Sequence, residues 1–312
     1  MKEKSHGMAS VLAALAANLL VAISKFVGFA FSGSTAMLNE SIHSVVDCGN
    51  QILLLIGDKR AKGMASESHP FGESRAKYFF SIVVAMMLFF AGGALGIMEA
   101  TEKLFHPEHS VENTWLVMGI LAFGMIVECF SLRVAMKEIA ELNKEKLPLF
   151  RFLRESRHSE VLIIFAEDLC AVIGLLLAML GTILVAVTGL AFFDALSGLL
   201  IGLMLCLAAL FLAREFYSLI IGESMTATDR QLMNKAFDRA EVKHLINLKT
   251  IHLSPTNILV AAKIELQSEY RAESATVINR IEEEIRRSFP QYKIYIYIET
   301  DVYQPGYQVK SE

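Results

Sequence analysis

Long apolar stretches fill the first two thirds of the chain. Six of them are long enough to cross a bilayer as helices, which takes about 20 residues each. They lie near residues 8–31, 35–57, 78–102, 114–135, 160–186 and 191–213. Short links at 32–34 and around Gly189 force their flanking helices to run antiparallel. The pattern predicts an all-α six-helix transmembrane bundle over residues 1–221.

From about Gly222 the pattern becomes that of a soluble domain. It predicts a helix at 228–241, strands at 246–253 and 258–266, a helix carrying Val277 to Ile285, and a strand at 294–298. The order α-β-β-α-β suits an open sheet with helices on one face. We therefore expect a small α+β domain over 222–303 and a loose tail over 304–312.

Basic residues are distributed unevenly between the loops. The segments 58–77 and 136–159 are rich in Lys and Arg, whereas the opposite loops 32–34, 104–113 and 187–193 contain none. Since basic loops stay on the cytoplasmic side, both termini are predicted to be cytoplasmic. The apolar run after Lys2 and Lys4 is too long for a signal-peptide core, so it is interpreted as a retained span. The compact chain without a targeting extension favours a bacterial inner (plasma) membrane.

The composition agrees with an integral membrane protein. Hydrophobic residues make up 54% and charged residues 20% of the chain, against about half and a quarter in soluble proteins. The net charge of −4 gives no indication of nucleic acid. The four cysteines show no CxxC spacing and are interpreted as small core residues. No nucleophile–base pattern or phosphate-binding loop appears on a soluble element, so an enzyme is not expected.

Two polar patches interrupt predicted spans. In the second span Glu40, His43 and Asp47 fall on one helical face, and in the fifth span Glu167 stands beside Asp168. An ionisable residue inside hydrocarbon costs about 2.5–3.5 kcal/mol on insertion scales, so each needs a partner or a task. Carboxylates and imidazole are ligands of divalent metals. The alternative is a polar network that joins the helices.

Further polar residues lie in other spans. Lys25, near the far end of the first span, is expected to extend its ammonium group to the interface. Glu128 and Ser131 share one face of the fourth span. They either line the water-filled side of the bundle or hydrogen-bond to other helices.

Several short motifs follow one another in a characteristic order. They are His43-x-x-x-Asp47, His69-Pro70-Phe71-Gly72-Glu73-Ser74-Arg75, Asp168 with Gly174, Asp194 with Ser197 and Gly198, and Gly222-Glu223-Ser224. This order, over almost the whole chain, resembles the cation diffusion facilitators. That family consists of metal–proton antiporters with six transmembrane helices and a cytoplasmic metallochaperone-like domain.

The resemblance implies a tetrahedral transport site with two ligands from the second helix and two from the fifth. His43 and Asp47 match the second-helix pair, and Asp168 matches the fifth-helix aspartate. The family's other ligand position is occupied by Ile164. The Glu167-Asp168 pair resembles a divergent branch that includes the mitochondrial zinc exporters of animals. Glu167 or Glu40 could supply the missing ligand; Glu167 could instead carry protons or bind another helix, and Glu40 could be a vestibule charge.

The resemblance also implies a function. We expect proton-coupled efflux of divalent cations, Zn²⁺ first, from the cytoplasm, with no prosthetic group. Mn²⁺ or Fe²⁺ as the main ion, or a metal-binding membrane protein that does not transport, are the alternatives. The expected partners are the cation, protons, membrane lipid and a second copy of the chain, with Lys77 or Arg75 against Glu215 or Glu223 as a candidate pairing. Tyr297 stands where the family's soluble domain carries a histidine, so no conventional metal site is expected there.

Overall fold

A computed structural model describes residues 8–105, 113–143 and 146–306 of the chain. It contains two compact units, each described here by itself. The first holds the residues up to Ala61 together with Ala76–Tyr217, and the second holds Lys62–Arg75 together with the chain from Ser218 onward. The predicted domain limits at 221 and 303 stay predictions. The predicted tail lies outside the described residues from 307, as does most of the 104–113 loop.

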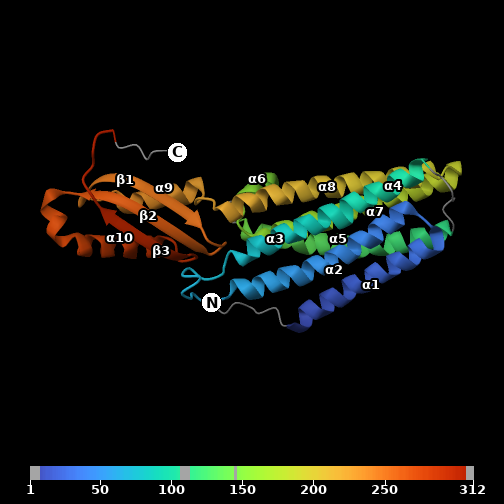
Figure 1. Ribbon diagram of the computed structural model, residues 1–312, viewed down its shortest axis with the longest axis horizontal. Helices are drawn as coiled ribbons and strands as arrows, with labels where there is room; N and C mark the ends of the chain where they lie inside the picture. The colour runs from blue at the N-terminus through green and yellow to red at the C-terminus, as the bar shows by residue number, and fades with distance from the viewer. Residues whose placement is uncertain (1–7, 106–112, 144–145, 307–312) are drawn as a thin grey trace. The chain divides into compact units, whose positions relative to one another are not determined.

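The first unit is a bundle of long helices that run alongside one another (Figure 1). Its helices are α1 (Met8–Ser32), α2 (Thr35–Ala61), α3 (Ala76–Met87), the π-helical η1 (Leu88–Ala94), α4 (Leu95–Phe105), α5 (Thr114–Leu142), the short α6 (Leu149–Glu155), α7 (Ser159–Thr188) and α8 (Phe192–Ile221). Because α3, η1 and α4 form one continuous helix, each predicted span corresponds to one long helix.

Four of these described helices are long and apolar enough to cross a membrane: Ala76–Phe105, Thr114–Leu142, Ser159–Thr188 and Phe192–Ile221. In α1 the apolar stretch Asn18–Ser32 is shorter. The remaining long helix, α2, carries the polar patch predicted from the sequence. The predicted helical membrane region is therefore confirmed, and its most polar long helix carries three of the five candidate ligands, Glu40, His43 and Asp47.

The middle of the Ala76–Phe105 helix packs directly on α8. A Cβ atom added at Gly93 would lie 2.9 Å from the backbone nitrogen of Cys206 and 3.1 Å from the carbonyl oxygen of Gly202. No side chain fits between the two backbones there. Small residues at such a contact let membrane helices approach closely.

The start of α2 is held by a carboxylate from α8. Asp194, which is 4% exposed, accepts hydrogen bonds from the Ser34 hydroxyl and from the backbone N–H of Thr35, the latter at 2.5 Å. The Ser34 hydroxyl in turn accepts from the backbone N–H of Met37 at 3.1 Å. A negative charge at a helix N-terminus satisfies unpaired N–H groups and interacts favourably with the helix dipole. Asp194 therefore fixes where α2 begins.

The second unit is a three-stranded sheet with helices packed against it (Figure 1). Its elements are α9 (Ala227–Phe237), β1 (Val242–His252), β2 (Asn257–Leu266), the 3-10 helix η2 (Ser268–Glu273), α10 (Ser274–Ser288) and β3 (Lys293–Thr300). The strand order is β1-β2-β3, with β1 antiparallel and β3 parallel to β2. Alternate residues of β2, such as Ile258 and Val260, share a core with Ile281 of α10 and Phe237 of α9. The predicted α-β-β-α-β order is confirmed.

The segment Lys62–Arg75 belongs to this second unit although it precedes the third span. The Phe71 ring packs edge-on against Tyr295 with 5.3 Å between ring centroids. The Ser74 hydroxyl donates a hydrogen bond of 3.2 Å to the carbonyl oxygen of Leu253. The motif His69 to Arg75 therefore anchors the loop on the sheet.

Glu265 at the end of β2 makes the stability of the second unit depend on pH. Its carboxylate is buried and accepts a hydrogen bond of 3.0 Å from Lys243, which lowers the pKa of Glu265 below its usual 4.5. A lowered folded-state pKa gives stability that is present above pH 4.5 and is lost as the pH falls through the folded-state value. We expect hydrogen-exchange protection of β1 and β2 to fall in that acidic range, and Glu265→Gln to remove much of this dependence. An equal dependence in Glu265→Gln and in the exposed control Glu269→Gln would contradict the prediction.

Candidate metal site

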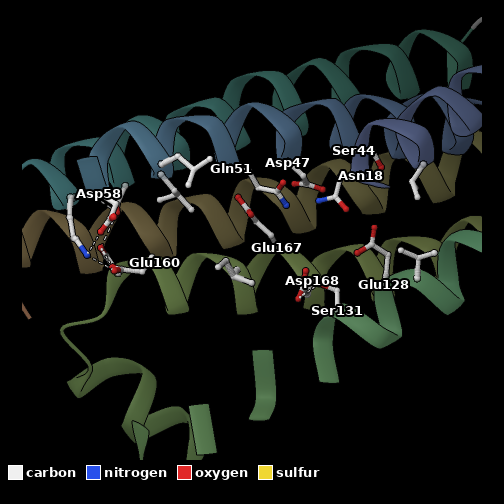
Figure 2. A pocket seen from close by; sticks show the side chains of 18 residues that line it. Asn18, Ser44, Asp47, Gln51, Asp58, Glu128, Ser131, Glu160, Glu167 and Asp168 are labelled. Carbon is white, nitrogen blue, oxygen red and sulfur yellow. Dashed lines mark hydrogen bonds and ion pairs between the residues drawn. The ribbon is translucent and has the colours of Figure 1, made fainter. Parts of the chain in front are cut away.

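A cavity of about 420 Å³ enters the first unit between its helices. Its walls come from α1, α2, α3, α5 and α7 (Figure 2). They consist of Asn18, Val21, Ser44, Asp47, Gln51, Leu54, Leu55, Asp58, Lys77, Ser81, Val127, Glu128, Ser131, Ser159, Glu160, Ile164, Glu167 and Asp168. Three of the five predicted metal ligands, Asp47, Glu167 and Asp168, are among them. Glu128 and Ser131 also line it, and Ser131 in addition hydrogen-bonds to another helix, so both alternatives considered for this face occur.

His43 of α2 does not line the cavity itself, but it lies one turn from Asp47, which does. The His43 Nδ1 atom lies 3.7 Å from Oδ1 of Asp47, as their four-residue spacing on one helix predicts. His43 is 1% exposed, and neither of its ring nitrogens has a hydrogen-bond partner among the described residues. The same holds for Oδ1 of Asp47. Buried polar atoms without partners are costly and rare, so this pair has unused capacity to bind a cation.

The two acidic residues of α7 are held by different neighbours. Glu167 accepts a hydrogen bond of 2.6 Å from the Asn50 side chain of α2, and Asp168 accepts one of 2.9 Å from the Ser131 hydroxyl of α5. In Figure 2 the Glu167 carboxylate points into the space near Asp47, whereas Asp168 is turned toward Ser131. Successive residues of a helix point about 100° apart, which explains the divergence.

The described residues do not form a closed metal site. Within residues 8–105, 113–143 and 146–306, no three His, Cys, Asp or Glu side chains are close enough together to hold one ion. His43 and Asp47 are adjacent, and Asp168 faces the same cavity. To share an ion with them, the carboxylate of Asp168 or Glu167 would have to move closer to His43 and Asp47.

Glu40 has a different partner. Its Oε2 atom lies 3.0 Å from Nζ of Lys25 on α1, and both side chains are fully buried. Neither residue lines the cavity. The expectation that Lys25 extends to the membrane interface is therefore wrong. A buried carboxylate within reach binds the ammonium group and removes the need for water.

One end of the cavity carries charges from three helices. Lys77 of α3 lies 2.9 Å from Asp58 of α2 and 2.8 Å from Glu160 of α7, and all three are partly exposed. Within the chain Lys77 thus pairs with Asp58 and Glu160, and the pairing of Lys77 or Arg75 with Glu215 or Glu223 in a dimer stays a prediction. Gln51 and Asp58 continue the face of Asp47 at helical spacing, a signal that could have identified them.

Comparison with known proteins gives consistent matches. The sequence model of a family described as the cation efflux transmembrane domain matches residues 11–221. The mitochondrial proton-coupled zinc antiporter SLC30A9 of Homo sapiens is 27% identical over 82% of this chain and 45% of its own length. Metal tolerance protein C4 of Arabidopsis thaliana is 25% identical over 85% of the chain and 58% of its own length. An uncharacterized transporter of Methanocaldococcus jannaschii is 24% identical over 89% of this chain and 95% of its own length. The chain thus spans about half the length of the human and plant relatives.

Proposed function

Because the chain belongs to the cation efflux family, we propose that it carries divalent metal cations, zinc first, across a membrane in exchange for protons. The family is one of transporters, which agrees with the expectation that the chain is not an enzyme. The human relative is named a proton-coupled zinc antiporter. The proposal also names the preferred ion, the side chains that bind it and its coupling to protons.

The observation that supports the proposal best is the pair His43 and Asp47 beside the cavity, because the His43 ring nitrogens and Oδ1 of Asp47 have no hydrogen-bond partner among the described residues. His43 and Asp47 offer one imidazole nitrogen and one carboxylate from a single helix, which is half of a tetrahedral zinc site. We propose that α7 completes it with Asp168 and Glu167 as candidate ligands. Glu40 is left outside this set, because its carboxylate is bound to Lys25.

Proton coupling follows from the chemistry of these ligands. A metal ion binds deprotonated carboxylates and neutral imidazole, so binding releases protons and protonation releases the ion. Histidine changes its charge near physiological pH, which makes such an exchange usable in a cell. The cavity supplies a water-accessible approach from the end of the bundle that carries Asp58, Lys77 and Glu160.

A transport assay tests the proposal. Purified protein in liposomes should take up Zn²⁺ at least about tenfold faster when the lumen is acidic than when no pH gradient is imposed, since protons leaving the lumen drive the cation inward. Comparing Zn²⁺, Mn²⁺, Fe²⁺, Co²⁺ and Cd²⁺ identifies the preferred ion, because oxygen-rich ligand sets discriminate weakly. Uptake that ignores the gradient would contradict proton coupling. Binding without uptake would favour the alternative of a metal-binding membrane protein.

Two further parts of the proposal concern the assembly and its membrane. We propose a homodimer in a bacterial inner membrane with both termini in the cytoplasm. Light scattering of the detergent-solubilised protein measures the oligomeric state, and protease access to the soluble domain in sealed cells and inverted vesicles measures the orientation.

A further inference from the structure

A buried ion pair lies directly beyond the inner end of the cavity. On α1 the cavity is lined by Asn18 and Val21, and Lys25 lies one turn further along the same face. On α2 Ser44 lines it, and Glu40 lies one turn further. The two side chains meet at 3.0 Å, and each is 0% exposed. The pair therefore occupies the continuation of the cavity rather than a side branch.

Two more of the helices around the cavity, α5 and α7, approach this pair at a glycine. A Cβ atom at Gly124 of α5 would lie 3.5 Å from Cε of Lys25. A Cβ atom at Gly174 of α7, two turns beyond Glu167, would clash with Oε1 of Glu40, so only glycine fits there without displacing the carboxylate. Four helices thus meet at the pair: α1 and α2 supply the charges, and α5 and α7 each approach it with a glycine.

We propose that the Lys25–Glu40 ion pair closes the transport path on the side opposite the end of the cavity that carries Asp58, Lys77 and Glu160. This inference rests on the proposed transport function, because a cation that leaves Asp47 in that direction meets the pair. Separating the pair leaves two buried charges that must be hydrated, so the pair opens together with water entry. Removing one partner has the same effect, since the remaining charge is then most stable where water reaches it.

A cysteine at position 21 reports which side of the membrane reaches the cavity. Val21 lines the cavity one turn from Lys25, and the four native cysteines are first replaced by alanine. The full chain with Val21→Cys is placed in sealed vesicles without metal, and a membrane-impermeant thiol reagent is added to one side at a time. With the ion pair intact, we expect labelling from one side to be at least about tenfold slower than from the other.

Breaking the pair should remove this difference. Lys25→Met or Glu40→Gln should raise labelling from the slow side at least about tenfold, and the double variant should return it most of the way toward the original rate. The double variant leaves no unpaired charge, and such replacements of buried pairs are often tolerated. The matched control is the partly exposed pair of α4, Lys103 and Glu99 at 3.7 Å, whose variants Lys103→Met and Glu99→Gln should leave both rates within about twofold.

Three results would overturn the proposal. They are equal labelling from both sides with the pair intact, an unchanged slow-side rate in both single variants, and a double variant that labels like the singles. If the pair had only a structural role, breaking it would lower the thermal stability without changing the side from which the cysteine at position 21 is labelled. If the single variants do not fold, Gly174→Ala displaces the Glu40 carboxylate while keeping both charges, and it should raise the slow-side rate. If the unmodified chain does not transport a metal ion, the proposed function is contradicted, but the labelling rates can still be measured and compared.

Discussion

Asp47→Asn should abolish zinc uptake, by about 100-fold or more, in protein that is still folded. The asparagine keeps the shape of the side chain but removes the negative charge next to His43 at the inner end of the cavity. Changing only a group that supports a metal ligand typically costs 10–100-fold, so losing a ligand should cost at least as much. Uptake into liposomes loaded with a zinc-sensitive dye measures the effect, and size-exclusion chromatography checks the fold.

The matched control for this prediction is Asp58→Asn. Asp58 lies on the same helix and lines the same cavity, but three turns from Asp47, where it binds Lys77 at 2.9 Å. The same chemical change there should reduce uptake no more than about threefold, because exposed ion pairs contribute little. Near-normal uptake by Asp47→Asn, or equal losses in the two variants, would refute the assignment of Asp47.

Asp194→Ala should lower the thermal unfolding midpoint by about 5 °C or more. Alanine leaves the Ser34 hydroxyl and the Thr35 backbone N–H without their acceptor at a buried position. Hydrogen bonds to a charged group are worth about 1.5–3 kcal/mol each, and buried donors left unpaired add to that cost. For a protein of this size a change of 1 kcal/mol shifts the midpoint by roughly 2–4 °C. Fluorescence-detected size-exclusion after heating measures the change.

Two companion variants sharpen the test. Asp194→Asn keeps one acceptor oxygen and should lose less stability than Asp194→Ala. Glu99→Ala removes a partly exposed carboxylate and should shift the midpoint by about 1 °C or less. If Asp194→Ala and Glu99→Ala have the same thermal unfolding midpoint, Asp194 does not hold the start of α2.

The order of helices and strands could be predicted from the sequence because it depends on local signals. The length of each apolar run fixes a membrane helix, and alternation or helical spacing separates the strands from the helices of the second unit. The docking of Lys62–Arg75 on that unit could not be predicted in the same way. It depends on contacts such as that of Phe71 with Tyr295, which are far apart in the sequence.

The candidate site shows the same division. The proximity of His43 and Asp47 follows from their spacing on one helix and could be predicted. The neighbours of Glu167 and Asp168 depend on how α7 is rotated against α2 and α5, which no local pattern encodes. Lys25 was misassigned for a related reason. A position near a helix end favours extension to the interface, but the buried partner came from another helix.

The π-helical segment Leu88–Ala94 sets the rotational phase of its whole span. A π turn contains more residues than an α turn, so the part after Ala94 is rotated relative to a continuous α-helix. The part after Ala94 includes Gly96, whose carbonyl oxygen accepts a hydrogen bond of 3.5 Å from the Asn39 side chain of α2. Deleting one residue of the segment would restore an ordinary helix and turn Gly96 to another face relative to Lys77. The phase therefore depends on the number of residues in the segment, and an insertion or deletion would change it, whereas a substitution that leaves Gly93 in place would not.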